Sequence, residues 1–122
     1  MKKSCLVLLA HGSRNPDWRE PFDELLRELQ GEAGAERVRL AYMQLASPSL
    51  PDVVRDLAAQ GVDTIRVLPL LMSAGNHAYE DIPAEVATLR KKHCGVAIEI
   101  LPPVGTHPRF KSMMRELVEE SL

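Results

Sequence analysis

Four short apolar runs, separated by longer amphipathic segments, constrain the fold of this chain more than any other feature. The segments between and after the runs repeat apolar residues at the three- and four-residue spacing of a helix. Strands that alternate with helices predict a parallel sheet with helices on both faces. We therefore expect an α/β fold with a four-stranded sheet. Its strands are predicted over Ser4–Ala10, Val38–Met43, Ile65–Met72 and Val96–Leu101.

The four helical segments carry their own start and stop signals. Pro21 predicts a late or kinked start for the first helix, because proline lacks the N–H that a helix interior uses. Ser47 followed by Pro48 predicts the cap of the second helix. The third helix is expected over residues 84–93. The fourth is expected to bury the apolar side chains spaced along it, namely Phe110, Met113, Met114, Leu117 and Val118.

The order of the strands decides which loops meet in space. If the order is 2-1-3-4, as in flavodoxin-like folds, the first and third strands are neighbours at the topological switch point. His11 follows the first apolar run, and His77 follows the third after a short turn. Ligands of open α/β sheets bind at the carboxyl ends of the strands. This order therefore predicts that both histidines lie at the mouth of one crevice.

The polar stretch after the third run indicates metal chemistry, although a blander interpretation stays open. Neutral imidazoles bind first-row divalent metals, and a site with two of them keeps open positions. Glu80 and Asp81 follow His77 at three and four residues, so either carboxylate could orient the imidazole. A histidine at a strand end is, however, often only structural, and Asp81 could instead cap a helix ahead of Pro83.

The residues after His11 allow two interpretations. Gly12 and Ser13 lie at a strand-to-helix turn, where backbone N–H groups can cradle a phosphate. The glycine-rich patterns typical of nucleotide sites are missing, so this signal is weak. Arg14 is better suited to pairing with a carboxylate of an acidic organic substrate.

Composition excludes several classes of function. A chain of 122 residues is long enough for one domain, which we expect over residues 1–122. A net charge of −2 and 4% aromatic residues argue against nucleic-acid binding. No apolar run reaches the length of a membrane span, so we expect no membrane partner. Cys5 and Cys94 are far apart in sequence, which favours free thiols in a reducing cytoplasm.

Five motifs are distributed over most of the chain, namely Leu9–Pro16, Pro48–Leu50, Pro69–His77, Asp81–Pro83 and Gly105–Pro108. Together they resemble the CbiX family of sirohydrochlorin chelatases, in its short, single-domain form. The resemblance implies a flavodoxin-like half of a class II chelatase. It also implies insertion of cobalt, iron or nickel into sirohydrochlorin in cobalamin, siroheme or related tetrapyrrole biosynthesis. The divalent metal would be a substrate, with no permanently bound cofactor, and the chain would pair as a homodimer.

The resemblance also implies roles for individual residues. His11 and His77 match the two histidines that handle the metal and catalyse insertion, with Glu80 as a possible third ligand. Family members often carry Glu where this chain has Gln44, and a neutral amide replaces a carboxylate poorly. The residues implied in tetrapyrrole binding are Ser13, Arg14, Gln44, Ser73, Ala74, Gly75 and Asn76.

Two further expectations follow from this assignment. Met72 and the loop from Ser73 to Tyr79 are candidates for the homodimer interface. A non-catalytic carrier of metal or tetrapyrrole on the same fold remains the alternative function, because fold does not determine function.

Overall fold

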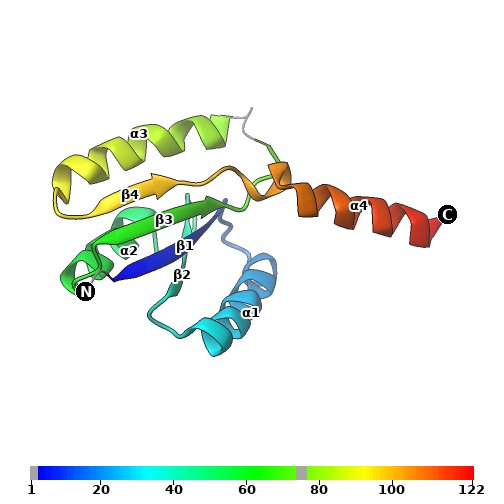
Figure 1. Ribbon diagram of the computed structural model, residues 1–122, viewed down its shortest axis with the longest axis horizontal. Helices are drawn as coiled ribbons and strands as arrows, with labels where there is room; N and C mark the ends of the chain where they lie inside the picture. Colours follow the sequence, from blue (N-terminus) through cyan, green and yellow to red (C-terminus); the bar gives the residue numbers. More distant parts are fainter. Residues whose placement is uncertain (1–2, 74–76) are drawn as a thin grey trace.

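The computed structural model describes residues 3–73 and 77–122, with residues 77–79 described by their backbone alone. Strands and helices alternate along the chain, which confirms the predicted α/β fold (Figure 1). The elements are β1 (Ser4–Ala10), α1 (Pro16–Ala33), β2 (Val38–Tyr42), α2 (Leu50–Ala59), β3 (Thr64–Pro69), α3 (His77–Lys92), β4 (Ala97–Ile100), a short 3-10 helix η1 (Val104–Thr106) and α4 (Pro108–Ser121).

The sheet has the order β2-β1-β3-β4, and every pair of neighbouring strands is parallel. The predicted order is therefore correct, and β1 and β3 are the two central strands. Their register pairs Leu9 of β1 with Pro69 of β3. Because the two strands end at nearly the same level, the loops that follow them start from adjacent points on the carboxyl edge.

Alternation along β1 explains why helices cover both faces of the sheet. Val7 and Leu9 point to one face, where they pack in a core with side chains of α2 and α3. Leu8 and Ala10 point to the other face, where Trp18 and other apolar side chains of α1 cover them. Figure 1 shows α1 and α3 on opposite sides of the sheet. Full burial of each such aliphatic side chain stabilises the fold by about 1.5–3 kcal/mol.

A buried tyrosine holds α1 against the carboxyl end of β2. The Tyr42 hydroxyl donates a hydrogen bond to Asp23 of α1 at 3.2 Å, and its ring lies 6.4 Å from that of Trp18. Burial, reinforced by the Asp23 carboxylate, raises the pKa of Tyr42 to about 12. The hydroxyl is therefore a donor at every physiological pH, and this contact fixes the position of the loop that follows β2.

The caps of the first two helices differ from those expected from the sequence. Helix α1 starts at Pro16, without the predicted late start, because Asn15 caps it: its side chain accepts a hydrogen bond from Asp17 N–H at 2.9 Å. Ser49, not Ser47, caps α2 by accepting from Asp52 N–H at 3.3 Å. Ser47 lies too early, because the carbonyl of the next residue accepts from the end of β2.

Helix α3 is longer than predicted, and β3 is shorter. The helix begins at His77 instead of Ala84 and contains Pro83 in its second turn. Asp81 therefore lies inside the helix, and the interpretation of Asp81 as its cap is wrong. Strand β3 ends at Pro69, as expected of a residue that cannot donate to the ladder.

The prediction for the last helix is wrong in a way that matters for assembly. None of the residues of α4 is buried, and the helix projects away from the sheet (Figure 1). A hydrogen bond from Gly105 N–H to the Leu71 carbonyl, at 2.9 Å, ties η1 beside the end of β3 and directs the chain outward. Four apolar side chains remain 42–52% exposed, namely Met113, Met114, Leu117 and Val118.

Helix length and hydropathy also bear on membrane contact. None of the helices in the described part of the chain is both long and apolar enough to cross a bilayer.

Candidate functional site

A cavity of about 260 Å³ lies at the carboxyl edge of the sheet, where the sequence predicted a crevice. Its walls come from the residue after β1, from the loop after β2 and from α3. The lining residues are His11, Met43, Gln44, Asp81 and Glu85. The structure therefore brings His11 and Gln44 together and adds two carboxylates from α3.

A tight backbone contact holds the His11 turn against the loop after β2. Met43 N–H donates to the Ala10 carbonyl at 2.9 Å, and Gln44 N–H donates to the His11 carbonyl at 3.2 Å. Gly12 is buried with φ +107°, and a β-carbon there would overlap the Gln44 carbonyl oxygen. Only glycine fits this position, so it sets the placement of both His11 and Gln44.

The second predicted histidine is placed by its backbone. His77 is the first residue of α3, which follows β3, the neighbour of β1. The predicted contact residues Ala74, Gly75 and Asn76 lie outside the described residues. A metal ion shared between His11 and His77 therefore stays a prediction.

Two carboxylates of α3 give the cavity its electrostatic character. Asp81 and Glu85 are four residues apart and so lie on one side of the helix. Glu85 is half-buried, and burial together with the Asp81 carboxylate raises the pKa of Glu85 above its ordinary value. Sequence reasoning considered Asp81 and missed Glu85. The signal was present, since Glu85 follows His77 by eight residues and Asp81 by four.

The other predicted site residues lie near the cavity in sequence but do not line it. The Ser13 hydroxyl accepts a hydrogen bond from Asn15 N–H at 3.0 Å, which shapes the turn into α1. Arg14 is exposed and makes no ion pair within the described ranges. Ser73 is exposed after β3, and Glu80 is exposed in the first turn of α3.

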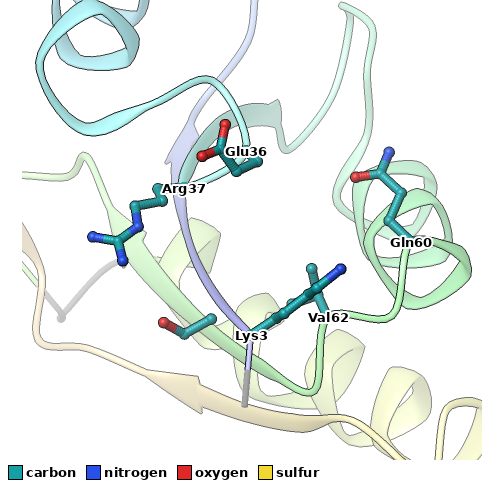
Figure 2. A pocket seen from close by; sticks show the side chains of 6 residues that line it. Lys3, Glu36, Arg37, Gln60 and Val62 are labelled. Carbon is teal, nitrogen blue, oxygen red and sulfur yellow. The ribbon is translucent and has the colours of Figure 1, made fainter. Parts of the chain in front are cut away.

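A second cavity, of about 300 Å³, opens at the amino edge of the sheet, far from these groups along the strands (Figure 2). Charged groups of both signs line it, including Lys3, Glu36 and Arg37. Its lining residues Lys3, Arg37 and Val62 lie just before β1, β2 and β3, at the amino ends of these strands. The carboxyl-edge cavity is therefore the better candidate for chemistry.

Solved structures of a CbiX protein and of a SirB chelatase share this α/β fold. A cobalamin biosynthesis CbiX protein from Marinobacter aquaeolei superimposes with a TM-score of 0.84 and 37% identity, covering 97% of this chain and 96% of that one. The sirohydrochlorin chelatase SirB from Bacillus subtilis, in complex with cobalt, has a TM-score of 0.82 at 22% identity. It matches 97% of this chain over 50% of its own length.

Sequence comparison then identifies the family. The CbiX pattern matches residues 5–121. A sirohydrochlorin cobaltochelatase from Sulfurisphaera tokodaii is 33% identical over 120 residues, which are 96% of this chain and 92% of that protein. A chloroplastic sirohydrochlorin ferrochelatase from Arabidopsis thaliana is 26% identical over 96% of this chain and 52% of its own length. The chain belongs to the CbiX family.

Proposed function

We propose that this chain is a lyase that inserts a divalent metal ion into sirohydrochlorin. The observation that carries the proposal is the CbiX match over residues 5–121 in a chain whose carboxyl-edge cavity contains His11. The metal, Co²⁺, Fe²⁺ or Ni²⁺, is a substrate of this reaction. Its product would serve cobalamin, siroheme or a related tetrapyrrole route.

The residues of the cavity fit the chemical demands of insertion. The ion must exchange its water for protein ligands and be presented to the ring nitrogens. His11 and His77 are the proposed ligands, because neutral imidazole binds divalent ions and exchanges them readily. Glu80, in the same turn of α3 as His77, is the proposed third ligand.

The tetrapyrrole carries several carboxylates, so a protein of net charge −2 needs local cations to bind it. Arg14 is exposed three residues after His11 and is the proposed carboxylate partner. Gln44 lines the cavity and can donate or accept a hydrogen bond from the ring. Ser13 and the segment 73–76 are proposed as further contacts.

An absorbance time course tests the proposed function directly. Sirohydrochlorin is mixed with Co²⁺, Fe²⁺ or Ni²⁺ in turn, with and without the protein. The protein should accelerate the spectral change of metallation for at least one ion. The alternative, a carrier of metal or tetrapyrrole, predicts binding of one component without any increase in the initial rate.

We also propose that two copies pair as a homodimer through α4. The helix carries a stripe of exposed Met, Leu and Val side chains. Its first residue, Pro108, also lines a second apolar surface, a cavity of about 350 Å³ with Leu68, Leu101, Pro103 and Val104 in its wall. Met72, three residues after the end of β3, is 66% exposed and is a further candidate for the interface. A catalytic cavity of about 260 Å³ is also small for a tetrapyrrole, and a facing copy would enclose the ring.

The dimer predicts that a charge on the apolar stripe of α4 disrupts assembly. Leu117→Glu should give a monomer by light scattering at concentrations where the parent chain is a dimer, because a carboxylate is costly to bury without a partner. Ser112→Glu adds the same charge on the other side of α4 and should stay dimeric. A parent chain of monomer mass at all working concentrations would refute the pairing.

We propose that residues 1–122 work as one domain in a reducing cytoplasm. Cys5 is buried in the sheet and Cys94 is exposed, and both are free thiols. Free thiols are typical of that compartment.

A further inference from the structure

Metal insertion needs a proton acceptor as well as metal ligands. Two pyrrole N–H bonds break, the electron pairs stay on the nitrogens to bind the metal, and two protons leave the ring. A histidine nitrogen that ligates the ion has no lone pair left for a proton. If His11 and His77 hold the metal, another group in the cavity must accept the protons.

Two carboxylates in the cavity wall can accept a proton. Gln44 and Met43 are neutral and cannot serve as bases. The titratable groups that line the cavity are His11 from the end of β1 and the carboxylates Asp81 and Glu85 from α3. No ion pair to either carboxylate occurs within residues 3–73 and 80–122.

We propose that Glu85 is the base that accepts the protons released from the tetrapyrrole nitrogens. The inference rests on the proposed metal insertion. Each N–H proton moves to a Glu85 carboxylate oxygen, and Glu85 releases it to water before the next proton arrives. No oxidant or further reactant is needed, because the ring nitrogens keep their electrons.

The position of Glu85 suits this role. Glu85 lines the cavity and is half-buried, whereas Asp81, one helical turn earlier, is exposed to solvent. The raised pKa of Glu85 makes its carboxylate a stronger base than an ordinary glutamate.

The test compares Glu85→Gln with the parent chain at saturating tetrapyrrole and Co²⁺. The maximal insertion rate should fall by ~10²-fold, the effect typical of losing a positioned base. The dissociation constant for Co²⁺ should be unchanged, since the metal ligands are intact. Glu28→Gln removes the same charge from the exposed part of α1 and should insert metal at the parent rate.

Chemical rescue separates a base from a structural residue. Glu85→Ala leaves space in the cavity wall, so added formate should raise its insertion rate in proportion to concentration. Formate should not rescue His11→Ala, which lacks a metal ligand. A Glu85→Gln rate equal to the parent, or a loss confined to Co²⁺ affinity, would overturn the assignment. A parent chain that inserts no metal would instead refute the proposed function.

Discussion

Replacing either His11 or His77 with alanine should lower the rate of metal insertion by ~10²-fold or more. Each substitution removes a proposed ligand of the incoming ion. The folded state should be little affected, because the His11 side chain is exposed and alanine is a favourable residue at the start of a helix. The measurement is the initial insertion rate of each variant, with a melting curve to show that it is folded.

The double variant gives an independent check of the same pair. His11→Ala with His77→Ala should insert metal scarcely more slowly than either single variant, because groups that act as a unit are not additive. A folded single variant with the parent rate would show that the histidine pair is not the site.

Replacing Gly12 with alanine should produce the largest loss of stability of any small substitution near the site. A left-handed backbone costs a non-glycine residue about 1–2 kcal/mol. The added methyl group also overlaps the Gln44 carbonyl, and overpacking of this kind costs about 1–3 kcal/mol. The free energy of unfolding should therefore fall by about 2–5 kcal/mol, as measured by urea denaturation.

A second glycine supplies the control for this experiment. Gly31 lies inside α1, where a β-carbon would meet no atom within 4 Å. Gly31→Ala should raise the free energy of unfolding by about 0.5–1 kcal/mol, because alanine favours the helix. Gly12→Ala should also slow metal insertion, since the turn that places His11 must move. Equal stability of the Gly12→Ala and parent chains would contradict the close contact described above.

Local sequence patterns predicted the framework of this protein well. The four apolar runs form the four strands. The sequence also correctly predicted that His11, which follows β1, lies at the carboxyl edge of the sheet. These features depend on side-chain periodicity within a few residues, which is visible in one dimension. The helix starts were wrong where several polar residues could cap, because the choice between Ser47 and Ser49 depends on contacts to β2.

Other features were decided only when distant segments met. The pKa of Glu85 is raised by burial and by the Asp81 carboxylate. Glu85 lines one cavity with His11 and Gln44, which come from distant parts of the chain. Position 12 must be glycine because the Gln44 carbonyl approaches it from another loop.

The last helix shows most clearly what the sequence by itself determined and what the tertiary structure decided. The apolar spacing of Met113, Met114, Leu117 and Val118 correctly predicted an amphipathic helix. The same spacing suits a helix that covers its own sheet and a helix that binds a second chain, since the hydrophobic effect is not directional. Only the path through η1, with Gly105 bonded to the Leu71 carbonyl, turned α4 away from the sheet and left its stripe exposed.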